Sequence, residues 1–400
     1  MRANIKFHIL ITFSVVLFSC IEPFNIDSES FESVLVVEAT ITNELKHQEI
    51  KLSRTFSIDE DGLNPELNAK VSVMDRDSNV FEFSEVEPGI YISNQVFAAE
   101  QNKEYSLRIQ TSNGRRYSSK PASFDSLSLI SNINFQATDF NDVEGVGIFL
   151  SGTSDSEEAR FYRYTYEETY KIVAPFWTPL KLVITDFDNF GLSLQPRTEE
   201  QKVCFRTETS NSIILTSTND LSVNQVSNFR VRFIEKNEPI LRNRYSIKIN
   251  QFSQSREAYK FYETLQEFSN LESLFSQTQP GFFSGNLFSE EDANEKVVGF
   301  FDVSSVTSQR LFFNFNDVFE DERLPPYFVS CTVIEPLVRP FENAPPESSE
   351  LLQAVNSGFF IFGYQVLEPE AGQGPYGLVS RACGDCTALG TNVEPDFWVE

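Results

Sequence analysis

Histidine is scarce in this 400-residue sequence, which contains only His8 and His47. His8 lies in an N-terminal stretch that resembles a removable signal peptide, so the mature chain would keep a single imidazole. Hydrolytic triads and multi-histidine zinc sites need imidazole groups. The sequence therefore lacks the usual parts of most such sites, and we interpret His47 as a solvated turn residue.

Positive charge is also in short supply. The chain has 32 Lys and Arg against 58 Asp and Glu, a formal net charge of −26. A protein that binds nucleic acid neutralises phosphates with a basic surface, and the field of this chain would repel such a ligand. We therefore expect no nucleic-acid partner.

Sequence motifs for common enzyme chemistry are absent. There is no Gly-rich phosphate loop, no G-x-S-x-G and no metal-protease helix. Acidic runs at 59–62, 139–145 and 186–191 lack the ligand spacing of a calcium loop, so we interpret them as solvated loops. We expect no enzyme activity, catalytic residue, metal or cofactor. A carboxylate pair for hydrolysis stays open as the least favoured alternative, because the separation of two carboxylates is not readable from sequence.

The N-terminus is informative. Arg2 and Lys6 precede an apolar stretch, residues 7–18, that is too short to span a bilayer. Leu17-Phe18-Ser19-Cys20 resembles the bacterial lipobox, in which the cysteine is acylated after cleavage before it. We therefore predict a signal peptide at residues 1–19 and lipidation of Cys20. Two or three acyl chains would anchor the protein durably in the outer-membrane bilayer.

Four further cysteines remain in the mature chain: Cys204, Cys331, Cys383 and Cys386. An even number in an exported protein favours two disulfides, with three possible pairings. A zinc site and free thiols are the alternatives, although zinc sites usually use two C-x-x-C pairs and only Cys383 and Cys386 form one.

The hydrophobic pattern predicts a mainly β protein. The chain has 39 Phe and 13 Tyr, which can supply large buried contacts in short strands. After an acidic tether at 20–34, about seven short strands with polar turns fill residues 35–122, including an Asn113-Gly114 hairpin. This spacing is typical of an Ig-like β-sandwich domain.

Residues 123–400 are predicted to form a larger β-rich domain with one amphipathic α-helix. Ser255 is a suitable N-cap, and apolar residues recur every three or four positions over 256–269. A proline-rich loop is expected at 335–350 and a strand at 358–366. We interpret the aromatic face of the helix as core packing.

Several segments of the chain together carry a resemblance to a known family: 19–24, 35–38, 41–45, 50–55, 204–208, 255–262, 279–281, 285–286, 298–301, 383–386 and 392–398. They resemble a Bacteroidota outer-membrane lipoprotein family known only as a domain of unknown function. Members of that family are commonly encoded beside TonB-dependent receptors. The resemblance implies an accessory role for such a receptor.

These observations favour a non-enzymatic, lipid-anchored outer-membrane lipoprotein that faces the cell surface and assists a TonB-dependent transporter. The alternative from another class is an autonomous surface lipoprotein or adhesin that binds a glycan or peptide without a partner.

Overall fold

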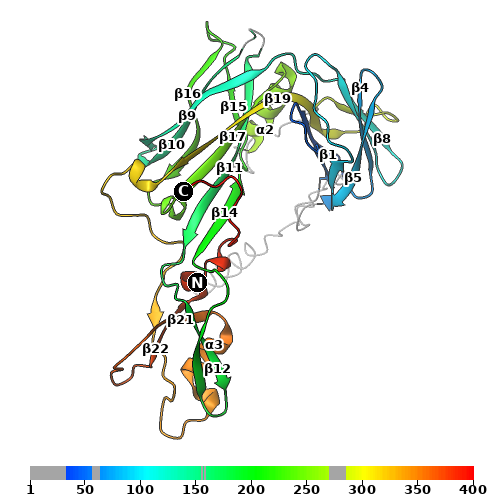
Figure 1. The fold of residues 1–400 in the computed structure, drawn as a ribbon. Coiled ribbons are helices and arrows are strands. Elements are labelled where there is room, and N and C mark those ends of the chain that lie inside the picture. The colour runs from blue at the N-terminus through cyan, green and yellow to red at the C-terminus, as the bar shows by residue number, and fades with distance from the viewer. Residues whose placement is uncertain (1–32, 56–63, 155, 157–158, 270–284) are drawn as a thin grey trace, which may run out of the picture.

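The computed structural model describes residues 33–55, 64–154, 156, 159–269 and 285–400. The predicted mainly β class is confirmed: the described residues form 22 strands and only three α-helices. Three parts can be followed in Figure 1, and we call them the N-terminal module, the central sandwich and the distal module. Among the described residues, no helix is both long and apolar enough to cross a membrane.

The N-terminal module is an Ig-like sandwich. Its strands follow the order β1-β2-β6-β5-β4-β7-β8, which matches the Greek-key order of immunoglobulin domains. Buried side chains alternate along β1, β4 and β7 and contribute to one apolar core. The strands are β1 (Leu35–Thr42), β2 (Glu49–Arg54), β3 (Asn64–Pro65), β4 (Lys70–Asp75), β5 (Val80–Glu87), β6 (Ile90–Ser93), β7 (Tyr105–Gln110) and β8 (Arg116–Ser119).

One long strand joins this module to the rest of the chain. The first half of β19 (Val297–Phe313) pairs in parallel with β1, and its second half pairs antiparallel with β17. The short β18 (Leu287–Ser289) pairs with β8. The module that the sequence placed at 35–122 therefore also takes in two strands from beyond residue 285. The sequence of a strand does not determine which other strand it pairs with. The sequence pattern therefore did not predict that β18 and β19 belong to this module.

The central sandwich consists of two packed sheets. A three-stranded sheet, β16-β10-β9, covers one face of β14-β11-β17-β19, and their facing side chains form the largest core cluster. β15 extends the second sheet beside the first half of β11. The strands are β9 (Ser128–Phe140), β10 (Val143–Ser154), β11 (Phe161–Val173), β14 (Val203–Thr209), β15 (Ile214–Ser217), β16 (Gln225–Glu235) and β17 (Tyr245–Ser253).

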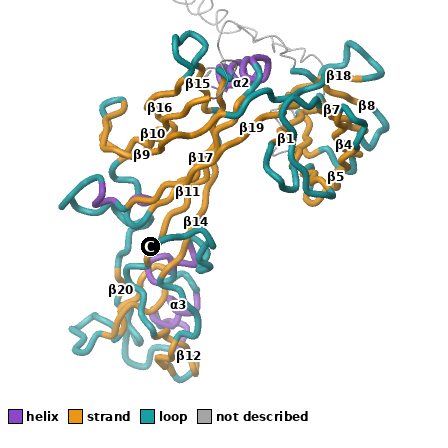
Figure 2. The backbone as a smooth tube through the Cα atoms, turned by 45° about the horizontal axis from the view of Figure 1, so that its top comes forward, coloured by secondary structure: helices purple, strands orange, loops and turns teal. Residues whose placement is uncertain are grey.

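The predicted helix is confirmed as α2 (Arg256–Ser269). The Ser255 hydroxyl caps it by accepting a hydrogen bond from the Ala258 amide at 3.1 Å. Its aromatic face is only partly buried: the rings of Phe261 and Phe300 on β19 lie 5.5 Å apart, and Ala258 is the helix residue that is fully buried. The helix lies beside the junction between the N-terminal module and the central sandwich (Figure 2).

The distal module lies at the foot of the molecule (Figure 1) and has its own small core around Leu182, Leu351, Phe362 and Leu378. It includes a helix that the sequence analysis did not predict, α3, which Ser349 caps and Gly358 ends at φ 71°. Its elements are β12 (Leu180–Asp186), β13 (Gly191–Pro196), β20 (Val333–Ile334), α3 (Glu350–Ser357), β21 (Phe360–Gln365), β22 (Tyr376–Ser380) and α4 (Arg381–Gly384). Short 3-10 turns occur at Pro239–Leu241, Phe315–Asp317, Pro346–Ser348 and Cys386–Ala388.

Candidate functional site

The predicted lipidation site, Cys20, lies outside the described residues, as do the signal peptide at 1–19 and most of the tether at 20–34. Lipidation therefore stays a prediction from the lipobox.

The four remaining cysteines form two disulfides. Cys204 on β14 is bonded to Cys386, and Cys331 is bonded to Cys383, with Cα–Cα separations of 5.6 and 5.7 Å. The two cysteines of the C-x-x-C pair are therefore bonded to Cys331 and Cys204 and not to each other. As a result, the segment from α4 to residue 388 is tied both to the central sandwich and to the loop that enters the distal module.

The two acidic runs that the structure describes, at 139–145 and 186–191, contain turns. The two central residues of the β9–β10 hairpin, Asn141 and Asp142, have φ of 51° and 61°, as in a type I′ turn. The Asp186 carboxylate accepts two hydrogen bonds from Asn189, which lower the pKa of Asp186. The run at 59–62 lies outside the described residues. Across the described ranges, no three His, Cys, Asp or Glu side chains are grouped so as to hold a metal ion.

A groove of about 900 Å³ lies at the junction of the N-terminal module and the central sandwich. Strands β1, β2, β11, β17 and β19 and helix α2 contribute its walls. Phe252, Phe261, Tyr262 and Phe300 give it an aromatic lining. His47 lies at its rim, and its Nδ1 donates a hydrogen bond to the Ser93 carbonyl at 2.6 Å. His47 is an exposed turn residue, as expected.

Charged residues of the groove are mostly paired. The Nζ of Lys46 lies 2.6 Å from Oε2 of Glu44, and the Nζ of Lys51 lies 3.4 Å from Oε1 of Glu49. Glu167 accepts from Arg310 at 2.5 Å. The Arg163 guanidinium contacts two aromatic rings instead of a carboxylate. The groove therefore combines apolar walls with a few polar groups, which is the make-up of a ligand-binding recess.

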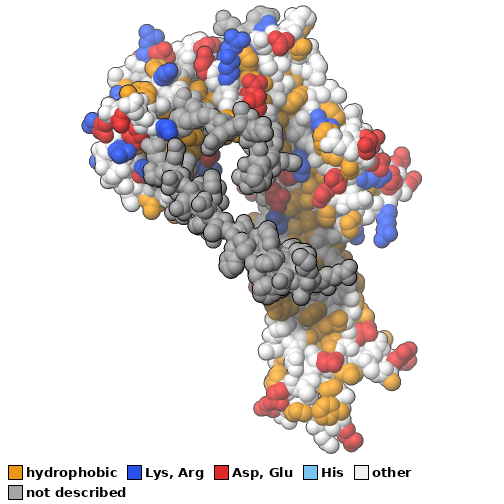
Figure 3. Space-filling model, turned by 180° about the vertical axis from the view of Figure 1, so that it is seen from behind, with side chains coloured by type: hydrophobic (Ala, Val, Ile, Leu, Met, Phe, Trp, Pro, Cys, Tyr) orange, Lys and Arg blue, Asp and Glu red, His pale blue; other side chains and the backbone are white. Residues whose placement is uncertain are grey.

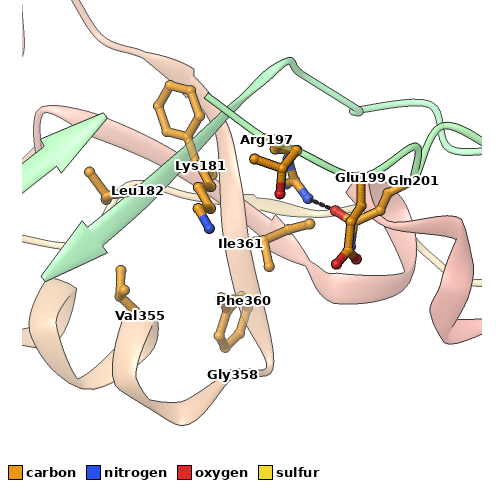
Figure 4. Close-up of a pocket in the computed structure, with 11 residues that line it drawn as sticks. Lys181, Leu182, Arg197, Glu199, Gln201, Val355, Gly358, Phe360 and Ile361 are labelled. Atoms are coloured by element: carbon orange, nitrogen blue, oxygen red, sulfur yellow. Dashed lines mark hydrogen bonds between the residues drawn. The ribbon is translucent and has the colours of Figure 1, made fainter. Parts of the chain in front are cut away.

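A second, smaller recess of about 310 Å³ lies in the distal module. The Lys181 side chain on β12 points into it, and Phe360 on β21 and Val355 on α3 form its apolar side (Figure 4). The Arg197 guanidinium donates a hydrogen bond to Gln201. Burial lowers the pKa of Arg197, against the attraction of Asp385. Arg197 is thus engaged by the protein itself, which leaves Lys181 as the cation that faces the recess.

Of the groove residues, the sequence analysis considered a structural or binding role for His47 and for the helix at 256–269, and named others only as part of the family resemblance. The others come from strands that lie far apart along the chain, from β1 to β19, each of which looks like an ordinary half-buried strand by itself. No spacing motif could have brought them together.

The fold and recesses define a mainly β protein with a large aromatic-lined groove. The chain belongs to the family described as a domain of unknown function, DUF4249, whose match covers residues 21–310. This confirms the predicted resemblance to a family of unknown function.

The other comparisons add little. No curated protein sequence matches the chain. Among solved structures, a DUF4785 family protein from Legionella pneumophila aligns over 54% of this chain and 49% of its own, at 8% identity and a TM-score of 0.16. The chain thus spans about half the length of that protein, and a likeness this low supports no conclusion about function.

Proposed function

We propose that this protein is a non-enzymatic, lipid-anchored lipoprotein on the outer surface of the outer membrane, where it assists a TonB-dependent transporter. The observation that carries the proposal is the lipobox Leu17-Phe18-Ser19-Cys20, which is typical of an exported protein held on a membrane by acyl chains. The association of the resembled lipoprotein family with TonB-dependent receptors supplies the partner.

Exposed apolar side chains of the distal module support a protein partner. Phe341, Phe359 and Leu367 are 59%, 76% and 87% exposed. On the face shown in Figure 3, the foot of the molecule carries hydrophobic and acidic side chains. Exposed apolar side chains with a polar surround are typical of interaction surfaces. We infer that the distal module contacts the transporter.

The two disulfides suit such a role. They tie the segment that ends the distal module to strand β14 of the central sandwich. A partner bound to the distal module would thereby be held at a fixed position relative to the groove. The groove could then hold a ligand while the transporter is docked.

The test is purification of the tagged full-length lipoprotein from native outer membranes in mild detergent, with mass spectrometry of the co-purified proteins. We expect a TonB-dependent barrel in near-stoichiometric amount. The double variant F359S/L367S should lose it, whereas L45S, which changes an equally exposed leucine of the N-terminal module (75% exposed), should keep it. Recovery of the acylated protein without any barrel would contradict the proposal.

The groove favours a second candidate, an autonomous surface lipoprotein that binds a glycan or peptide unaided. A recess of about 900 Å³ with aromatic walls is large enough for such a ligand. Calorimetric titration of the purified protein against glycan and peptide panels separates the two. Binding without a barrel, together with a barrel-free purification, would favour this candidate.

A further inference from the structure

Arg163 occupies a special position in the groove. It lies on β11, where Tyr162 and Tyr164 point into the core of the central sandwich. Because side chains alternate along a strand, Arg163 points to the opposite face, toward β1 and α2. There it lines the groove at the junction with the N-terminal module.

Two aromatic rings hold the Arg163 guanidinium. Its central carbon lies 4.4 Å from the ring centroid of Phe252 on β17 and 4.6 Å from that of Tyr262 on α2. Contacts of this length are cation–π interactions. They restrict the guanidinium plane but leave its N–H groups, which lie in that plane, as donors.

Those donors have few partners in the protein. The one hydrogen bond of the Arg163 side chain among the described residues joins Nη2 to the Thr40 hydroxyl at 3.4 Å, which is long. Its Nε is buried without a hydrogen-bond partner. No carboxylate of the described residues lies within 4.0 Å of the guanidinium, whereas Arg310 on β19 is paired with Glu167 on β11.

The rest of the groove fits an acid with an apolar body. Phe261, Leu265, Val298 and Phe300 offer apolar surface next to the guanidinium. The lysines of the rim, Lys46 and Lys51, already have carboxylate partners. Among the Lys and Arg residues that line the groove, Arg163 is therefore the one that the described residues leave without a carboxylate within 4.0 Å. A carboxylate, which accepts from two guanidinium N–H groups at once, matches this geometry.

We propose that the groove binds a ligand through a carboxylate held by Arg163, with an aromatic or aliphatic group packed on the side chains of α2 and β19. The carboxylate belongs to a small organic acid or to the C-terminus of a peptide. The inference concerns the groove alone and holds with or without a transporter partner.

The test is isothermal titration of the full-length protein in mild detergent with two acids, N-acetylphenylalanine and the hexapeptide Gly-Ser-Gly-Ser-Gly-Phe, each compared with its amide. We expect at least one acid to bind and its amide to bind about tenfold to a hundredfold more weakly, as expected for loss of a charged hydrogen-bond pair. The acid that binds more tightly identifies the source of the carboxylate.

Variants locate the interaction. R163Q should weaken binding of the acid by a similar factor, and R163K should restore part of it. R230Q is the matched control, because Arg230 also stacks on a ring, 3.8 Å from the centroid of Phe140, but lies outside the groove on β16. R230Q should bind like the unaltered protein.

Equal affinity for acid and amide, no binding of either acid, or unchanged affinity in a folded R163Q would overturn the inference. If thermal unfolding shows that R163Q is not folded, the comparison of acid and amide binding to the unaltered protein decides the question.

Discussion

Gly299 on β19 lies directly opposite Val37 on β1, at the parallel pairing that joins the two halves of the chain. Its φ is +134°, and a Cβ at this position would lie 2.1 Å from the Val37 carbonyl oxygen. Both the backbone conformation and the close approach require glycine. The junction that lines the groove therefore depends on one residue without a side chain.

G299A is expected to destabilise the protein by about 2–5 kcal/mol, because it combines backbone strain with a clash against main-chain atoms. Chemical denaturation of the unaltered and altered proteins measures the difference. G114A is the control: Gly114 also has a positive φ, +89°, but a Cβ added there would meet no atom within 4 Å beyond its chain neighbours. Its cost should be about 1 kcal/mol. A similar loss of stability in both variants would show that the close approach of Gly299 to the Val37 carbonyl does not require glycine.

The disulfides should differ in their effect on stability. The Cys204–Cys386 bond joins residues 182 positions apart, and the Cys331–Cys383 bond joins residues 52 positions apart. Chain-entropy arguments give the longer loop about 1 kcal/mol more stabilisation, within a range of about 2–5 kcal/mol for each bond. C204A/C386A should therefore unfold at lower denaturant than C331A/C383A. Peptide mapping without reductant checks the pairing, and peptides linking Cys383 to Cys386 would contradict it.

The elements that the sequence predicted are those determined by residues close together along the chain. Ser255 and the apolar spacing after it predicted α2, and Asn113-Gly114 predicted a hairpin, because caps and tight turns involve neighbouring residues. The sharing of β19 between two sheets was not predicted, since pairing depends on distant strands. Nor was Arg163, whose rings come from β17 and α2. Helix α3 was missed because its eight residues follow a proline-rich segment.

Stability at acid pH should depend on Asp75 in the N-terminal module. Burial by itself would raise the pKa of this carboxyl, but hydrogen bonds from Asn79 and from Lys103, whose Nζ lies 2.8 Å away, outweigh it and lower the pKa. Because the pKa of Asp75 is lower in the folded state, its ionised carboxylate stabilises the protein at pH values above 3.8, the pKa in the unfolded state. This contribution is lost as the pH falls through the folded pKa.

D75N should therefore melt at lower temperature than the unaltered protein at pH 7, and the gap should narrow as the pH falls from about 5 to 2. Thermal unfolding at a series of pH values measures it. D77N is the matched control, because Asp77 contacts the same lysine at 3.0 Å but its side chain is 69% exposed. The melting temperature of D77N should differ little from that of the unaltered protein at every pH. A gap for D75N that stays constant down to pH 2 would rule out this linkage.

A buried polar cluster crosses the core of the central sandwich. Glu168 on β11 accepts a hydrogen bond from the Tyr245 hydroxyl at 2.6 Å and pairs with Arg232 on β16 at 3.2 Å. Burial raises the pKa of Tyr245, so that its hydroxyl stays a donor. Removing either partner leaves the Glu168 carboxylate, whose side chain is only 6% exposed, with fewer hydrogen bonds.

We expect R232A to lower the free energy of unfolding by about 2–4 kcal/mol and Y245F by about 1–3 kcal/mol. The double variant should depart from additivity, because both residues act on one carboxylate. R206A is the control: Arg206 pairs with Glu208 at 2.8 Å, but both side chains are at least 41% exposed, so the cost should be about 0–1 kcal/mol. Denaturant unfolding of the four variants measures these differences. Equal losses for R232A and R206A would mean that solvent reaches Glu168, because only screening by water makes a buried pair as weak as a surface pair.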